Sequence, residues 1–131
     1  MNHIKMICPV KLESNIHNFK PMIEIDINGL NGKLGKKDIE NWELLDIAEP
    51  YHLWFHLDDL PSGHFFLELP DETAIPTKQQ IYKSALQCRL YSKHKSSKEP
   101  IDVIYTQVKN LRKGTKPGQV IIIGKAKYIK V

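Results

Sequence analysis

The chain has 131 residues, of which 41% are hydrophobic and 26% are charged, and its formal net charge is +4. This length suits one domain with a single core, and the composition is that of an ordinary globular chain. The sequence has no run of about 18 apolar residues that would cross a membrane, and the apolar run at its N-terminus is too short for a signal peptide.

The first part of the chain predicts a leader, a strand and a short helix. Residues 1–22 show no clear periodicity and are expected to form an irregular N-terminal leader. Apolar and acidic residues alternate over 23–27, which is typical of a half-buried strand. The glycines within 29–37 match no phosphate-binding loop, so this segment is expected to be a strand-to-helix connection. Apolar residues at three-residue steps over 38–48 predict a short helix that ends before Pro50.

Two apolar runs that alternate like strands flank a turn containing Pro-Ser-Gly. Side chains alternate across a strand, so Trp54 and His56 should share one face of the first run. If the turn is tight, His56 and His64 should face the same region. An aromatic residue within an apolar strand usually packs in the core, although Trp54 could instead stack on a nucleic-acid base.

The remainder predicts one long helix followed by further strands. The residues of 77–80 have the spacing of a capping box, and the helix that they begin should run to about Ser92. A β-rich segment covers 101–108, and a buried-type strand is expected over 119–123. The turn after it leads into 128–131, which predicts a closing hairpin. These elements predict a single α+β domain with a mostly antiparallel sheet, one long helix and one short helix.

Charge is divided unevenly along the chain. Residues 1–80 carry seven lysines and 13 acidic residues, whereas residues 81–131 carry 12 lysines and arginines and two acidic residues. A basic half of this kind suits a polyanion-binding surface, because each neutralised phosphate releases condensed counterions. A solvated lysine face would give the same composition, so charge alone leaves both interpretations open.

Four short motifs follow one another along residues 35–131. They are Gly35-Lys36 with Glu40-Asn41 and Glu43-Leu44; Trp54-Phe55-His56 with Pro61-Ser62-Gly63-His64; Ser84-Ala85 with Tyr91-Ser92-Lys93; and Val103 to Lys109 with Arg112-Lys113 and Lys116-Pro117-Gly118. Their order and spacing resemble those of the NFACT-R family, an RNA-binding domain found in tailing factors that act on stalled ribosomes. Four departures from the family pattern are Ile39 in place of a lysine, Trp42 in place of an acidic residue, the order Pro-Ser-Gly-His, and Lys95 in place of an arginine.

The resemblance implies a standalone NFACT-R-like RNA-binding domain over residues 23–131. It implies binding of structured RNA, either tRNA or rRNA, in translation or ribosome-associated quality control, with the ribosome as a possible partner. The spacing between Gly35 and Trp54 looks more like that of short eukaryotic proteins in which the domain precedes a coiled coil, one of which binds DNA. It implies no cofactor and no enzymatic chemistry, and it leaves the oligomeric state open.

Basic residues that follow a strand and precede a turn can project together and contact phosphates, which gives affinity without sequence readout. The residues expected to hold the RNA backbone in this way are Lys109, Arg112, Lys113 and Lys116. Those expected to extend the footprint are Lys36, Lys93 and Lys95. Those expected to shape or line its centre are His56, Ser62 and His64.

Two alternatives come from other classes of function. A DNA-binding or general polyanion-binding module would use the same basic half. A metal-assisted hydrolase of nucleic acid or nucleotide would use His56 and His64 with a neighbouring carboxylate. The sequence offers no third firm metal ligand and no nucleophile at a recognisable spacing, so we expect a protein that is not an enzyme. Cys8 and Cys88 form no disulfide framework, which predicts a reducing, cytoplasmic setting without a membrane partner.

Overall fold

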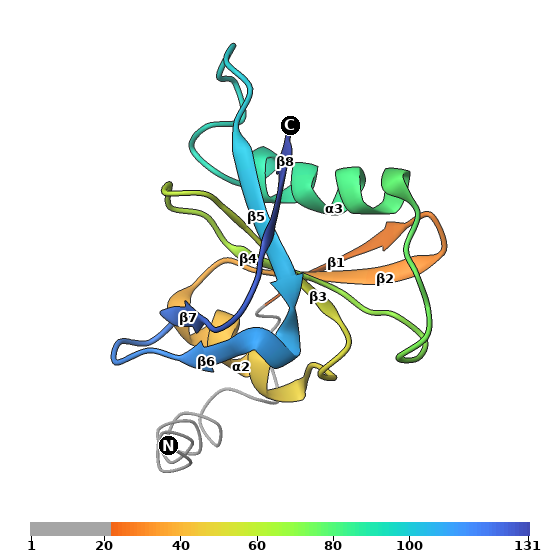
Figure 1. Ribbon diagram of the computed structural model, residues 1–131. Coiled ribbons are helices and arrows are strands. Elements are labelled where there is room, and N and C mark those ends of the chain that lie inside the picture. The colour runs from red at the N-terminus through yellow and green to blue at the C-terminus, as the bar shows by residue number, and fades with distance from the viewer. Residues whose placement is uncertain (1–21) are drawn as a thin grey trace.

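The computed structural model describes residues 22–131, and its centre is a six-stranded antiparallel sheet (Figure 1). In spatial order the strands are β1 (Met22–Ile27), β2 (Leu30–Gly35), β4 (His64–Leu67), β3 (Leu53–Leu57), β5 (Asp102–Gln107) and β8 (Lys127–Lys130). With one long and one short α-helix, this confirms the predicted single α+β domain. The expected leader lies outside the described residues, apart from Met22, which begins β1.

The long helix α3 (Lys78–Leu90) covers one face of the sheet. It begins with the predicted capping box, in which Thr77 Oγ1 accepts from the Gln80 N–H at 3.0 Å and Gln80 Oε1 accepts from the Thr77 N–H at 2.9 Å. Ala85 and Cys88 from the helix and alternate residues of the strands, such as Phe55 and Phe65, are buried together. Each large apolar side chain buried here contributes about 1.5–3 kcal/mol relative to its exposed state.

The other face of the sheet carries the short helix α2 (Asp38–Ile47) and a two-stranded hairpin of β6 (Leu111–Lys113) and β7 (Val120–Ile122). Leu44 packs here against Trp54 and Phe66 in a second apolar cluster. Trp54 is 2% exposed, which confirms that it is a core residue. None of the helices in residues 22–131 is long and apolar enough to cross a membrane.

The glycine-rich segment after β1 is the strand β2, so the predicted strand-to-helix connection is wrong. Asn28 and Gly29 both have positive φ, which is the two-residue hairpin geometry that an Asn-Gly pair favours. A Cβ on Gly32 would overlap the ring of Phe65 in the neighbouring strand, so glycine permits this close approach. Glycine at a core-facing position interrupts the alternation of apolar and polar residues by which a strand is recognised in sequence.

The predicted closing hairpin at the C-terminus is also wrong. β7 pairs with β6, whereas β8 crosses to the large sheet and pairs with β5. Gly124, at φ 98°, lies where the chain leaves one sheet for the other, and Thr106 Oγ1 donates to the Lys125 carbonyl at 2.9 Å. β7 is half-exposed rather than buried, because only alternate residues face the core.

Candidate nucleic-acid interface

Three of the predicted phosphate-binding residues form an exposed group, which we call the hairpin platform: Lys109, Arg112 and Lys116. They lie on the 3-10 helix η3 (Val108–Asn110), on β6 and on the turn between β6 and β7. Arg112 Nη1 donates to the carbonyls of Lys109 at 3.1 Å and Leu111 at 2.8 Å, which holds the guanidinium beside η3. Within the part of the chain that the structure describes, none of the three has an acidic partner.

Lys113 is placed differently from the hairpin platform. Its ammonium lies 2.8 Å from Asp46 Oδ1 and 5.1 Å from the centroid of the Trp42 ring, and its side chain is only 9% exposed. Both partners belong to α2. Lys113 therefore joins the hairpin to α2, and its predicted role as a phosphate contact stays a prediction that has to compete with these contacts.

Lys36 borders the hairpin platform, although it is distant in sequence. It is exposed between β2 and α2, and its backbone N–H donates to Glu40 Oε1 at 3.0 Å. The turn between β6 and β7 packs against the first residue of α2, since a Cβ on Gly118 would lie 2.8 Å from Asp38 Cβ. The structure thus brings Lys36 to the same end of the small hairpin as Lys116.

Lys93 and Lys95 lie away from these residues. They are exposed in the loop after α3, beside the start of β5, whereas η3 follows the end of β5 (Figure 1). The six-residue strand between the two places spans about 20 Å. The predicted cations therefore form two groups, one at each end of β5, which one ligand can contact together only if it extends along that strand.

His56 and His64 face one another between the sheet and α2, as the strand alternation predicted. Their ring centroids are 5.0 Å apart and the rings are nearly perpendicular. Trp54 Nε1 donates to His64 Nδ1 at 2.9 Å, and the His64 N–H donates to Asn41 Oδ1 at 3.2 Å. His64 is 5% exposed, so it supports the junction of β3, β4 and α2 and does not present its ring to solvent.

Burial lowers the pKa of both imidazoles below the ordinary value of 6.5. Burial, with a smaller contribution from His56, lowers the pKa of His64 to about 3. Burial also lowers the pKa of His56, against the opposing effects of the Leu57 carbonyl and of Asp58. A neutral His64 is what the indole N–H requires, because a protonated Nδ1 could not accept its hydrogen bond.

Ser62 closes the loop that joins β3 to β4. Its Oγ accepts from the Leu57 N–H at 3.1 Å and donates to the Gly63 carbonyl at 2.9 Å. The next residue, Gly63, packs so closely on β2 that a Cβ there would overlap the Gly35 carbonyl oxygen. Ser62 and Gly63 thus hold His64 at the start of β4.

Lowering the pH should destabilise the fold through His64. Its pKa in the folded state lies below its ordinary value of 6.5, so the unfolded chain binds a proton first as the pH falls. The stability that His64 contributes is complete above about pH 6.5 and is lost progressively towards pH 3. His64→Asn keeps an acceptor for the indole N–H but removes the titration. Between pH 7 and 5, wild type should lose about 2 kcal/mol more than this variant in urea unfolding. Equal losses of stability in wild type and His64→Asn would contradict the lowered pKa of His64.

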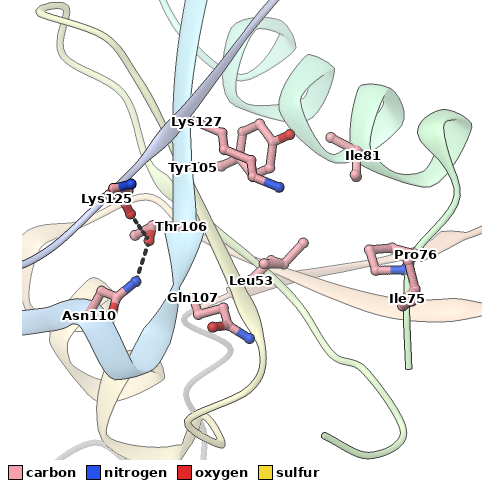
Figure 2. Close-up of a pocket in the computed structure, with 10 residues that line it drawn as sticks. All are labelled: Leu53, Ile75, Pro76, Ile81, Tyr105, Thr106, Gln107, Asn110, Lys125 and Lys127. Carbon is pink, nitrogen blue, oxygen red and sulfur yellow. Dashed lines mark hydrogen bonds between the residues drawn. The ribbon is translucent and has the colours of Figure 1, made fainter. Parts of the chain in front are cut away.

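Sequence reasoning did not single out two further cations, Lys125 and Lys127. They flank a hollow beside β5 that apolar side chains line (Figure 2). Their position follows from the pairing of β8 with β5, in which Lys127 lies opposite Tyr105. If β8 paired with β7, as the sequence predicted, neither lysine would lie beside β5.

The arrangement thus consists of three exposed cations on the small hairpin and a histidine pair held at the junction of β3, β4 and α2. Residues 22–131 contain no group of three His, Cys, Asp or Glu side chains placed to hold a metal ion. The chain belongs to the NFACT protein RNA binding domain family, whose model matches residues 33–129. Membership indicates RNA binding and suggests a role that is not enzymatic.

Several known proteins are similar to this chain. Coiled-coil domain-containing protein 25 of Danio rerio is 34% identical over 85 residues, which is 61% of this chain and 40% of the relative. Its homolog in Dictyostelium discoideum is 33% identical over 92 residues, 67% of this chain and 45% of the relative. The chain thus spans less than half the length of these relatives. The structure of the C-terminal of the fibronectin/fibrinogen-binding protein from Streptococcus suis matches with a TM-score of 0.73 at 25% identity, covering 98% of this chain and 55% of the other.

Proposed function

We propose that this chain binds structured RNA, tRNA above all and rRNA as the other candidate, by holding the RNA backbone on the hairpin platform. The observation that carries the proposal is a group of three exposed cations with no acidic partner within residues 22–131, in a member of this family: Lys109, Arg112 and Lys116. Other lysines form ion pairs within the fold. Lys33, for example, lies 2.8 Å from Glu68.

The hairpin platform suits a double-stranded RNA backbone. Arg112 is held by backbone carbonyls, so less side-chain freedom is lost when it meets a phosphate. The cations stand on a short hairpin whose other side packs against the core, so they form a rigid surface. Lys36 extends this surface, and Lys93 and Lys95 reach a second stretch of backbone about 20 Å away. A folded RNA the size of tRNA spans both surfaces, whereas a short oligonucleotide does not.

The biological setting that we propose is translation in the cytoplasm, with ribosome-associated quality control as the process and the ribosome as a partner. Phosphate contacts provide affinity and orientation but no sequence readout. The RNA would therefore be selected by its shape and by the spacing of its phosphates. His56 and His64 support the junction of β3, β4 and α2, and their lowered pKa values favour the uncharged form of each imidazole.

Binding to tRNA should be measured by fluorescence anisotropy across a salt series, with unlabelled duplex DNA as competitor. We expect the logarithm of the affinity to fall linearly with the logarithm of the salt concentration, and we expect tRNA to withstand an equal mass of DNA. Equal competition by DNA would replace the proposal with a general polyanion binder. Absence of binding at low salt would refute both RNA binding and general polyanion binding by the basic half of the sequence.

A further inference from the structure

A hollow of about 300 Å³ lies beside the end of β5, on the face of the sheet that α3 covers (Figure 2). Leu53, Ile75 and Ile81 supply most of its apolar lining. Ile75 is 88% exposed, so its side chain is available to a ligand at the rim of the hollow. The hollow has the size of one small ligand, at the lower end of the range of about 300–1,000 Å³ that such sites occupy.

Polar side chains reach this hollow because of the strand register. Tyr105 lies opposite Lys127, and Gln107 lies opposite Leu53, so all four project from the same face of the sheet. Figure 2 shows them converging on the space between β5 and α3. Lys125 also lines the hollow, and Figure 2 shows it across β5 from Tyr105 and Lys127, beside Thr106.

Four of the polar side chains around the hollow have no partner among residues 22–131. The Tyr105 hydroxyl, the Gln107 amide and the ammonium groups of Lys125 and Lys127 make no hydrogen bond or ion pair there. By contrast, Asn110 Nδ2 at the same rim donates to Thr106 Oγ1 at 2.8 Å. The unpartnered set comprises one amide, one hydroxyl and two cations around an apolar floor.

We infer that this hollow takes one unstacked nucleotide of an RNA. The apolar lining suits the faces of a base, and the Gln107 amide can donate to and accept from its edge. Lys125 and Lys127 supply the charge that the attached phosphate requires. A purely apolar ligand would leave both cations and the amide unused, whereas a nucleotide matches every group.

This inference rests on the proposed function, because the hollow and the hairpin platform approach one another at the end of β5, although they lie on opposite faces of the sheet. Asn110 lines the hollow, and its neighbour Lys109 belongs to the platform. An RNA whose backbone lies on the platform would therefore place an unpaired nucleotide next to the hollow. With both sites in use, the protein would bind an RNA helix that ends in a single-stranded overhang more tightly than an RNA helix with a blunt end.

The test compares two RNA hairpins that differ only in an unpaired 3′ overhang. Wild type should bind the overhang form about tenfold more tightly, which is the scale of stacking one base. The pocket variant I75S/Q107A should lose that preference and keep its affinity for the blunt hairpin. The matched control I47S/Q79A changes an exposed isoleucine, 58% exposed on α2, and an exposed glutamine on α3, and should behave as wild type.

The outcomes separate the hollow from the hairpin platform. Loss of preference in the pocket variant alone supports the inference, as does cross-linking of a 4-thiouridine in the overhang to Tyr105 or Pro76. If wild type binds both hairpins equally, or if the pocket variant keeps the preference, the inference is overturned while the proposed function stands. If wild type binds neither RNA, the proposed function fails and the inference fails with it.

Discussion

Replacing Lys109, Arg112 and Lys116 together by alanine is expected to weaken tRNA binding about 100-fold at physiological salt. Each of these cations is exposed and without an acidic partner in the described structure, so each is available to displace a counterion from a phosphate. The slope of log affinity against log salt should therefore become shallower by about 2 to 3. Anisotropy titrations at four or more salt concentrations measure both quantities, and the fold should be intact because all three side chains lie at the surface.

The control for this triple variant removes the same charge elsewhere. Lys78, Lys83 and Lys98 are exposed and lie outside the hairpin platform, so replacing them by alanine should leave the salt slope nearly unchanged. Lys113→Met tests the lysine that is already paired with Asp46. It should lower stability and leave the salt slope nearly unchanged, because its ammonium is held by α2. An equal loss of affinity in the control triple would mean that net charge, and not this surface, governs binding.

Gly63→Ala should destabilise the fold by about 3 kcal/mol, the upper part of the range for overpacking a rigid site. The added Cβ would overlap the Gly35 carbonyl oxygen, which is backbone of the neighbouring strand and cannot rotate away. Relief would require β4 to move from β2, which would also strain the hydrogen bond from the His64 N–H to Asn41. Urea unfolding monitored by tryptophan fluorescence would measure the change.

Ser62→Ala is the neighbouring control. It removes one hydroxyl that accepts from the Leu57 N–H at 3.1 Å and donates to the Gly63 carbonyl at 2.9 Å, but it creates no overlap. We expect a loss of about 1 kcal/mol. A Gly63→Ala variant no less stable than Ser62→Ala would show that the loop between β3 and β4 can yield, and that the close packing on β2 is not required.

The parts of the fold that follow from local pattern were predictable. The capping box at Thr77 depends on four consecutive residues, and the shared face of Trp54 and His56 depends only on strand alternation. The approach of His56 to His64 follows from the same alternation and a short connection. Each of these features is determined within about a dozen residues of chain.

The parts that depend on distant partners were not predictable. β8 adds to β5, about 20 residues earlier, because β5 would otherwise be an uncovered edge, and no local signal states this. The pairing of Lys113 with Asp46 joins residues 67 positions apart in the sequence, and no local pattern indicates it. Counting charges along the chain also joins Lys93 and Lys95 to Lys109, although the whole of β5 lies between them.

The sequence therefore indicated which kinds of residue the candidate surface contains, but not how the fold arranges them. The four motifs identify the family, since they can be read as short strings, and the family model covers the same region. No short sequence motif marks the hollow between β5 and α3. Its lining residues come from several distant elements, among them β3, the loop before α3, α3 itself, β5 and β8. Such a site appears only when the sheet order is known.

The most direct test of RNA binding through the hairpin platform is chemical-shift mapping of the isotopically labelled protein during titration with tRNA. We expect the largest amide shifts over residues 108–118 and at Lys36, with smaller shifts around Lys93 and Lys95. Shifts confined to the loop after α3, or an unchanged spectrum at tRNA concentrations that saturate the anisotropy signal, would contradict the hairpin platform as the RNA-binding surface.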